Sequence, residues 1–339
     1  MDGVDSPVTQ SGRRDPLGPA GAESLEPAAV EHARTVVDPV FLDSPQFVHD
    51  ELTAAAGRVV VVKVETVNPI GAFKGRGTWA ALAGLVGEGT VGPERPVVVA
   101  STGNFGAGVA YAGRALGVPV VVFAPRVAPV RKLERIRRLG ATLVQAGDDF
   151  DAARAAAARF AAEGPGELLV DGQDPRIALG AGTIAAELTD AARTGRLPAP
   201  AAIYVPVGNG SLIVGLGTWL CAALPGCRVV GVQSEAAPAM TLSWRAGRPV
   251  ETPTAATFAD GIATRVPVPE AVAAMRDRVD DMVLVSEEAL RAAQAALTAA
   301  LGVTVEGAAA ASWAGLLADP APPDGPAVVV VTGSNVDRP

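Results

Sequence analysis

Residues 96–125 read PVVVASTGNFGAGVAYAGRALGVPVVVFAP, and this stretch contains the pattern that decides the fold. Two apolar, β-branched runs, PVVVA (96–100) and PVVVF (119–123), enclose a glycine- and hydroxyl-rich loop and an alanine-rich segment. Runs that are apolar at every position are typical of strands in a parallel sheet whose two faces are both covered by helices. The stretch therefore predicts a strand, a loop, a helix and a second strand.

The same alternation of apolar runs and alanine- and leucine-rich segments continues through the chain. The further candidate strands are RVVVVKV (58–64), TLV (142–144), LLV (168–170), AIYVPV (202–207), RVVGVQ (228–233), MVLV (282–285) and AVVVVT (327–332). Strand–helix alternation of this length predicts an α/β protein, with its ligand at the carboxyl ends of the strands.

Three segments between the strands carry helix end signals. Ser44 followed by Pro45 predicts the start of a helix over QFVHDELTAAA, and Ser286 followed by two glutamates predicts another start. The segment VRKLERIRRLG predicts a basic amphipathic helix that ends at Gly140. Its charges are interpreted as a solvated face, with a phosphate-rich partner as the less favoured alternative.

Composition excludes several classes of function. The chain has 339 residues and a net charge of −8, which disfavours binding to nucleic acid or to an anionic membrane. Its only two histidines, His32 and His49, are too few for a multi-histidine metal site, and a histidine-based triad is nearly excluded. Two cysteines and the lack of an apolar leader indicate a cytoplasmic protein, and residues 1–22 resemble a disordered tail.

Two loops that follow predicted strands carry side chains suited to catalysis. The first, NPIGAFKGRG (68–77), contains Lys74 beside Phe73, and a partly desolvated lysine amine is a nucleophile that forms Schiff bases. Taken alone, an ordinary surface lysine is the simpler interpretation. The second, from Ser101 through Thr102 and Gly103 to Asn104, begins a helix and is suited to bind a carboxylate or phosphate. A tight strand–helix turn is the alternative there.

Two further loops complete the pattern. In PVGNGSLI (206–213), small residues allow backbone amides to surround a phosphate, and no Walker lysine is present. TGSNV (332–336) places a hydroxyl at the end of the last strand, although a simple C-terminal turn also explains it. Together the loops offer an amine, two anion sites and a neutral hydroxyl. That set fits pyridoxal phosphate, whose aldehyde, phosphate and ring nitrogen each need a partner.

The chain resembles the fold-type II pyridoxal-phosphate enzymes, the group of serine and threonine dehydratases, serine racemase, threonine synthase and cysteine synthase. The resemblance runs from about residue 26 to residue 337. The segments that carry it, in the family's order, are VVVKVETVNPIGAFKGRG, ASTGNFGAGVAYAGRALGVPVVVFAP, QDPRIALGAGTIAAEL, VPVGNGSLIVG, FADGIA, VEGAA and VVVVTGSNVD.

The resemblance implies a role for each site residue. Lys74 matches the lysine that binds the cofactor, and Asn104 matches the asparagine at the cofactor's phenolic oxygen. Thr332 matches the hydroxyl at the ring nitrogen, and Glu306 matches a glutamate near the cofactor. The substrate carboxylate is expected at Ser101, Thr102, Gly103 and Asn104, and the cofactor phosphate at Gly208, Asn209, Gly210 and Ser211, with Phe73 and Leu212 beside the cofactor.

Departures from individual subfamilies leave the reaction open. Phe105 stands where dehydratases have histidine, and Thr102 where racemases have a serine base. Gln233 stands where serine-racemase-like members carry a glutamate ligand for a cation, so no metal is expected. The leading hypothesis is α,β-elimination on a β-hydroxy amino acid such as serine or threonine. The alternatives are a β-replacement synthase and a non-catalytic binding protein, and a nicotinamide-dependent Rossmann enzyme lacks the glycine spacing.

The resemblance also implies an architecture. We expect two open, twisted, mostly parallel sheets flanked by helices, as in the tryptophan synthase β-like fold. Residues 23–94 and 171–339 are expected to form a large cofactor-binding domain, and residues 95–170 a small mobile domain. The expected partners are a small amino-acid substrate and a second copy of the chain in a homodimer.

Overall fold

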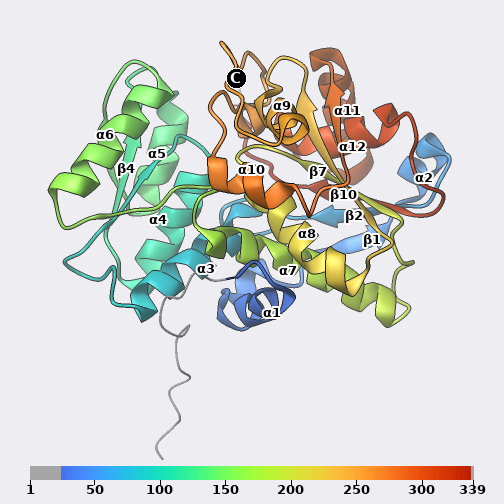
Figure 1. Ribbon diagram of the computed structural model, residues 1–339, viewed down its shortest axis with the longest axis horizontal. Helices are drawn as coiled ribbons and strands as arrows, with labels where there is room; N and C mark the ends of the chain where they lie inside the picture. Colours follow the sequence, from blue (N-terminus) through green and yellow to red (C-terminus); the bar gives the residue numbers. More distant parts are fainter. Residues whose placement is uncertain (1–23, 337–339) are drawn as a thin grey trace, which may run out of the picture.

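The computed structural model describes residues 24–336, which form two separate sheets with helices packed around them (Figure 1). The predicted α/β architecture of two mostly parallel sheets flanked by helices is confirmed. The tail predicted for residues 1–22 lies outside the described residues. Among the described helices, none combines the length and the apolar character that a membrane crossing requires.

The larger sheet has six strands in the described part of the chain, and all are parallel except the edge strand β1. In spatial order they are β1 (Gln46–Val48), β2 (Val60–Val64), β10 (Ala327–Val331), β7 (Ala202–Pro206), β8 (Arg228–Ser234) and β9 (Asp281–Val285). The last strand of the chain therefore lies in the middle of the sheet. This places the segment after β10 beside the segment after β2.

Helices bury both faces of the larger sheet. One face packs on α11 (Glu287–Leu301) and α12 (Gly307–Ala318), and the other on α7 (Pro175–Arg193), α8 (Ser211–Ala223) and α10 (Pro269–Met275). Val60 and Val62 of β2 belong to the first layer, whereas Val61 between them belongs to the second. This explains why the strand is apolar at successive positions, since side chains alternate between two dry faces.

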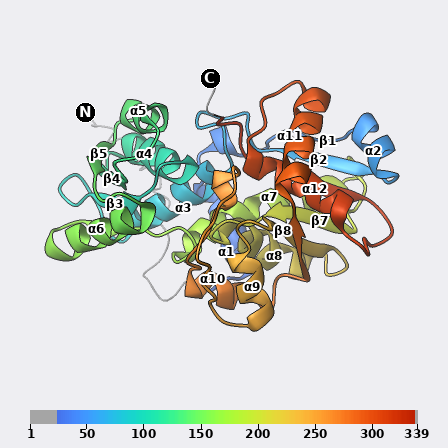
Figure 2. The same ribbon diagram turned by 90° about the horizontal axis from the view of Figure 1, so that it is seen from above.

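The smaller sheet has four parallel strands in the described residues and is built the same way. In spatial order they are β5 (Thr142–Gln145), β4 (Val120–Ala124), β3 (Val97–Ala100) and β6 (Glu167–Leu168). One face packs on α3 (Lys74–Gly87), α4 (Asn104–Leu116) and α5 (Val130–Arg138), and the other on α6 (Phe150–Glu163). Seen from above, α4, α5 and α6 lie together on one side of the molecule and α11 and α12 on the other (Figure 2).

The remaining elements are short and lie around the larger sheet. They are α1 (Pro27–Val36), the 3₁₀ turn η1 (Pro39–Phe41), α2 (Asp50–Ala56), α9 (Ala239–Ala246) and the 3₁₀ turn η2 (Asp260–Ile262). The predicted helix start at Ser286 is confirmed, because its side chain accepts a hydrogen bond from the amide of Ala289 at 3.1 Å. The basic segment forms α5, and Gly140 follows it in the left-handed conformation.

The helix start predicted at Ser44 is wrong. Residues 46–48 form the strand β1, and the helix begins only at Asp50, with His49 as its N-cap. The hydroxyl of Ser44 donates to Glu65 at 2.5 Å instead of accepting from a helix amide. A cap signal predicts a helix only when its side chain has no stronger partner elsewhere, and here a buried carboxylate is the partner.

Candidate active site

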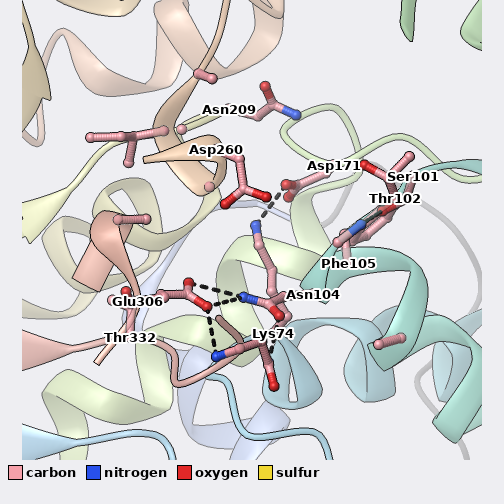
Figure 3. A pocket seen from close by; sticks show the side chains of 18 of the residues that line it. Lys74, Ser101, Thr102, Asn104, Phe105, Asp171, Asn209, Asp260, Glu306 and Thr332 are labelled. Atoms are coloured by element: carbon pink, nitrogen blue, oxygen red, sulfur yellow. Dashed lines mark hydrogen bonds and ion pairs between the residues drawn. The ribbon is translucent and has the colours of Figure 1, made fainter. Parts of the chain in front are cut away.

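A cavity of about 550 Å³ lies where the loops after β3, β7 and β10 meet the start of α3 (Figure 3). All four loops that the sequence indicated contribute to its wall. The predicted site residues that line it are Phe73, Lys74, Ser101, Thr102, Gly103, Asn104, Gly208, Asn209, Gly210, Ser211, Leu212, Glu306 and Thr332. The fold thus brings every predicted residue to one cavity, while the role of each stays a prediction.

Lys74 is the first residue of α3, and its side chain extends into the cavity (Figure 3). Its amine Nζ donates to Asp171 Oδ2 at 2.6 Å and lies 4.8 Å from the centre of the Phe73 ring. The side chain is only 15% exposed. The amine is thus partly desolvated, with a carboxylate on one side and an aromatic ring on another, and the simpler alternative of an ordinary surface lysine does not hold.

The loop before Lys74 is shaped by a single amide side chain. Asn68 Oδ1 accepts from the backbone amides of Ile70 and Ala72, and Asn68 Nδ2 donates to the carbonyl of Ala72 at 3.2 Å. After the lysine, the small residue Gly75 is required because a Cβ there would lie 2.1 Å from the Phe41 ring. These contacts determine where the α3 N-terminus, and with it the amine, is placed.

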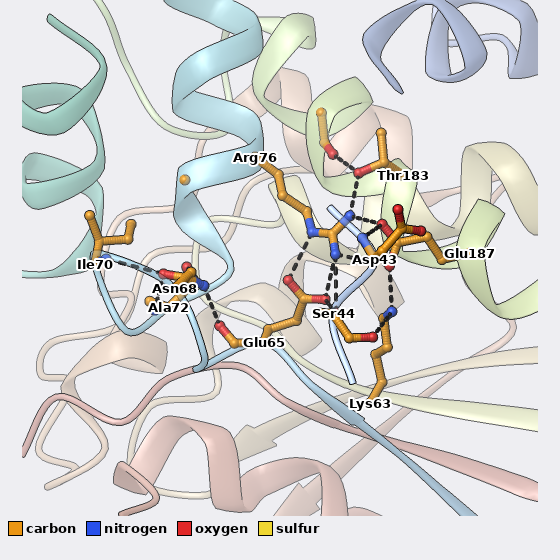
Figure 4. A network of polar contacts seen from close by, with 12 residues as sticks. Asp43, Ser44, Lys63, Glu65, Asn68, Ile70, Ala72, Arg76, Thr183 and Glu187 are labelled. Carbon is orange, nitrogen blue, oxygen red and sulfur yellow. Dashed lines mark hydrogen bonds and ion pairs between the residues drawn. The ribbon is translucent and has the colours of Figure 1, made fainter. Parts of the chain in front are cut away.

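Two residues beyond the lysine, Arg76 anchors α3 in a buried ionic network (Figure 4). Its guanidinium donates to Glu65 Oε2 at 2.8 Å and to Glu187 Oε1 at 2.5 Å, and Lys63 also donates to Glu187. Arg76 and Lys63 are fully buried. Burial lowers the pKa of Lys63, whereas the hydrogen bonds from Arg76 help hold the pKa of Glu187 below its usual range in spite of its burial. The network joins α3 to β2 and α7.

The loop after β3 is ordered by its own serine. Ser101 Oγ accepts from the amides of Gly103 at 3.2 Å and Gly106 at 2.9 Å, so this hydroxyl shapes the loop as well as lining the cavity. Thr102 and Gly103 lie half-buried before the first turn of α4. The first-turn amides of a helix have no partner within the helix, which makes this position suited to a carboxylate.

Asn104 and Glu306 join the two halves of the cavity. Asn104 Nδ2 donates to both carboxylate oxygens of Glu306, at 3.0 and 3.1 Å, and Asn335 Nδ2 donates to Asn104 Oδ1 at 2.7 Å. Burial raises the pKa of Glu306 to about 7, and the hydrogen bonds from Asn104 oppose that rise. Gly333 lies against the same carboxylate, where a Cβ would come within 2.3 Å of it. The orientation of the Asn104 amide is therefore fixed from two sides.

The loop after β7 forms a turn at the start of α8. Gly210 has φ of +95°, a conformation that favours glycine, and Gly208 packs so closely on Gly261 that a Cβ would lie 2.5 Å from its carbonyl oxygen. Asn209 Oδ1 accepts from Thr264 at 3.3 Å. Ser211 begins the 13-residue helix α8, whose N-terminal amides and dipole favour an anion.

Thr332 lies at the end of β10 and is 3% exposed. Its carbonyl accepts from the amide of Phe73 at 3.0 Å, so the strand end and the lysine loop are joined directly. Thr332 also lines the cavity (Figure 3), and the contact of its hydroxyl with a ring atom of the cofactor stays a prediction.

Asp171 is a cavity residue that the sequence analysis missed. It follows β6, and its carboxylate accepts from Lys74 and, at Oδ1, from Ser211 Oγ at 2.5 Å. The signal was present, because the residue directly follows the predicted strand 168–170, as the other site loops follow theirs. It was overlooked since VDGQ (170–173) has a single glycine and no hydroxyl side chain, unlike those loops.

Two other predictions concern charges and metals. Arg131, Lys132, Arg135 and Arg138 of α5 line the cavity, so the basic face of this helix is not simply solvated as predicted. Gln233 is buried and accepts from the amide and the hydroxyl of Thr241, at 2.8 and 3.0 Å. In residues 24–336 no group of three or more His, Cys, Asp or Glu side chains is placed to hold a metal ion.

The amine of Lys74, the amides at the start of α8 and the hydroxyl of Thr332 stand in one cavity, as an aldehyde, a phosphate and a ring nitrogen require. The family described as pyridoxal-phosphate dependent enzyme matches residues 41–333. The chain belongs to this family. Pyridoxal phosphate is therefore the cofactor of this enzyme, and the residues present fit it.

Relatives of this pyridoxal-phosphate dependent enzyme include two bacterial proteins named L-threonine ammonia-lyase. The chain is 38% identical over 283 residues to that of Geobacter sulfurreducens, a match that covers 83% of this chain and 68% of the relative. It is 34% identical over 286 residues to that of Thermotoga maritima, covering 84% and 69%.

Solved structures of the same fold include maize serine racemase, with a TM-score of 0.85 and 26% identity over 92% of this chain and 94% of that one. They also include the processed form of threonine deaminase isoform 2 from Solanum lycopersicum, with a TM-score of 0.82 and 26% identity over 98% and 96%. The fold-type II architecture that the sequence predicted for this enzyme is confirmed.

Proposed function

We propose that this enzyme is an ammonia-lyase that converts a β-hydroxy amino acid such as serine or threonine into a 2-oxo acid and ammonia. The observation that carries the proposal is the half-buried amine of Lys74, which stands in one cavity with two helix N-termini. The relatives named L-threonine ammonia-lyase, and the fold shared with the tomato threonine deaminase, support the same reaction. Elimination of water, followed by addition of water and release of ammonia, balances the overall reaction.

The cofactor is expected to be covalently held by Lys74 and anchored at Gly208–Ser211, with Leu212 and Phe73 packed beside it. Asn104 is expected at its phenolic oxygen, and Glu306 would hold the Asn104 amide in place. When bound, the cofactor supplies an electrophilic carbonyl carbon and a conjugated ring that withdraws electrons from the substrate Cα. Thr332 offers the ring nitrogen a neutral hydroxyl, which does not keep that nitrogen protonated as a carboxylate would.

The protein's own residues supply binding and proton transfer. The loop Ser101–Asn104 offers hydroxyls and first-turn amides to the substrate carboxylate. Lys74, freed when the substrate amine takes its place, is the general base that removes the Cα proton. The cavity lies between the two sheets, so that closure of residues 95–170 onto the rest of the chain would exclude water.

The first experiment tests the cofactor and the lysine together. We expect the purified protein to show an absorbance band at roughly 410–420 nm that is absent in Lys74→Ala. The variant should also lose activity by about 10²-fold to 10⁴-fold, as expected when a catalytic base is removed. Well-folded wild-type protein that shows no such band after incubation with pyridoxal phosphate would contradict the proposal and favour a non-catalytic binding protein.

The second experiment separates elimination from β-replacement. Serine, threonine and O-acylated serine are each incubated with the enzyme, with and without added thiols or amines, and 2-oxo acid and ammonia are measured. Formation of 2-oxo acid from serine or threonine without any nucleophile supports the lyase. Consumption of substrate only in the presence of a nucleophile would instead identify a β-replacement synthase.

Assembly and location complete the proposal. We infer a homodimer from the family resemblance, to be checked by analytical ultracentrifugation of the cofactor-loaded enzyme. A cytoplasmic location, independence of metal ions and the division at residues 95–170 are likewise parts of the proposal. Activity that survives exhaustive treatment with a chelator would support the expected independence of metal.

A further inference from the structure

Asp171 is held beside the amine of Lys74 by two hydrogen bonds and by the close packing of the residue that follows it. Its Oδ2 accepts from Lys74 Nζ at 2.6 Å, its Oδ1 accepts from Ser211 Oγ at 2.5 Å, and the residue is 8% exposed (Figure 3). The next residue, Gly172, has φ of +93° and packs so closely on Asn209 that a Cβ would lie 2.6 Å from its carbonyl oxygen. The carboxylate is therefore fixed between the lysine and the loop expected to hold the phosphate.

The other carboxylates of the cavity face different partners. Among the described residues that line it, Asp260 and Glu306 carry the remaining carboxyl groups. Glu306 is bonded to Asn104 and to the amide of Asn335, and the side chain of Asp260 is 56% exposed and paired with Lys132. Asp171 is thus the carboxylate in direct contact with the amine that handles the substrate proton.

The proposed reaction needs an acid as well as a base. Hydroxide is a poor leaving group, so the β-oxygen of serine or threonine must receive a proton as its bond to Cβ breaks. Lys74 removes the Cα proton, and a neighbouring carboxylate is suited to pass that proton on. On the basis of the proposed elimination, we infer that Asp171 is the acid–base partner of Lys74 and delivers the proton to the leaving oxygen.

The proton transfers balance. Lys74 takes the Cα proton and becomes an ammonium group, which gives one proton to the Asp171 carboxylate across their 2.6 Å contact. The resulting carboxylic acid donates that proton to the β-oxygen, and the electron pair of the Cβ–O bond leaves with the oxygen as water. The electron pair of the former Cα–H bond ends in the Cα–Cβ double bond. The lysine is again neutral and the carboxylate again ionised.

The decisive comparison varies the leaving group. Asp171→Asn keeps the shape of the side chain but supplies no carboxylic acid, and its amide has one acceptor oxygen where the carboxylate has two. We expect kcat with serine to fall by about 10²-fold to 10⁴-fold, whereas kcat with β-chloroalanine changes little, because chloride leaves without a proton. The control is Asp260→Asn, the same substitution at a cavity carboxylate that does not contact Lys74. It should not change the ratio of the two rates.

Two further measurements distinguish proton transfer from a structural role. Cofactor loading by absorbance and the thermal unfolding midpoint should both be close to wild type in Asp171→Asn. In Asp171→Ala, added formate should restore part of the serine activity by acting as the missing acid. This second variant decides the question if Asp171→Asn loads the cofactor poorly.

The outcomes are distinct. If Asp171→Asn loses activity equally on serine and β-chloroalanine at full cofactor loading, and formate restores nothing in Asp171→Ala, Asp171 only positions the lysine and the inference is wrong. If the wild-type enzyme forms 2-oxo acid from neither substrate, the proposed function itself fails. If the wild-type enzyme is active and Asp171→Asn slows both substrates equally, only the inference about Asp171 is rejected and the proposed function stands.

Discussion

At the scale of single residues, Glu306 carries an ionisable group where water barely reaches it. It is 6% exposed, and burial raises its pKa from 4.5 to about 7. A carboxyl group whose pKa is raised by folding binds its proton more tightly in the folded state than in the unfolded one. Its contribution to stability is therefore present in full below the unfolded pKa and is lost as the pH rises through about 7.

We predict that the cofactor-free protein loses stability between about pH 5 and about pH 8 by an amount on the order of 3 kcal/mol from this group. Glu306→Gln should remove most of that slope, because an amide does not titrate. The measurement is the free energy of urea-induced unfolding at several pH values. The control is Glu235→Gln, the same change at an exposed position, which should retain the slope. Identical slopes in wild type and Glu306→Gln would contradict the prediction.

The site residues show what sequence can and cannot find. The loops of Lys74, Asn104 and Thr332 were identified because each follows a strand or begins a helix, and parallel strands bring such loops to one edge. The role of Asn104 came from the family resemblance. Asp171 stands in an equivalent place but in a plain loop, and only its distance of 2.6 Å from Lys74 reveals it. Contacts between side chains far apart in the sequence have no local signature.

At the scale of elements, the position of α3 depends on the buried network around Arg76. Removing one partner of a buried ion pair leaves an uncompensated charge, which costs more than the loss of the contact itself. Here the loss of the guanidinium would leave the carboxylates of Glu65 and Glu187 facing each other, with Lys63 as the remaining cation between β2 and α7.

We predict that Arg76→Met lowers the free energy of unfolding by about 3–5 kcal/mol. The same substitution at Arg126, whose pair with Asp148 is largely exposed, should cost no more than about 1 kcal/mol. Both values come from urea denaturation of the cofactor-free proteins, so cofactor binding does not mask them. Comparable losses in the two variants would show that the network does not stabilise α3 more than a surface pair does.

The strands could be predicted from the sequence where every residue of the strand is buried. The predicted strands that are buried on both faces all occur, with ends shifted by a residue or two. An unbroken run of β-branched residues, as in β2 and β10, is a clear signal of such a strand. β1 was missed, since an edge strand of three residues, with Phe47 and Val48 partly exposed, has no such pattern. Ser44 misled because a local rule cannot anticipate a distant partner such as Glu65.

At the scale of the whole molecule, the assignment of strands to two sheets came from the family resemblance. Apolar runs identify strands but do not say which of them pair, and β3 through β6 resemble β7 through β10 in pattern. The same limit applies to the ion pairs between the two parts of the molecule. Lys132 of α5 pairs with Asp260, and Arg265 Nε donates to Asp151 Oδ2 of α6 at 3.0 Å. These pairs tie residues of the smaller sheet's helices to a loop and a turn beside the larger sheet.

These ion pairs, which join helices of the smaller sheet to segments beside the larger sheet, predict a salt dependence of substrate binding. They are partly exposed, and salt screens exposed charges over a Debye length of about 3 Å at 1 M. If they favour a closed arrangement around the substrate, KM for the amino acid should rise a few-fold with added sodium chloride, while kcat changes less. In Asp151→Asn, KM should already be raised at low salt and should respond less to further salt, because one screened pair is gone.

The matched control is Asp148→Asn. Asp148 is exposed, and its partner Arg126 belongs to the same part of the molecule, so this variant should keep the wild-type salt response. A salt response unchanged in Asp151→Asn would mean that this pair does not contribute to closure, and that the contacts of Asn104 with Glu306 and Asn335 join the two halves without it.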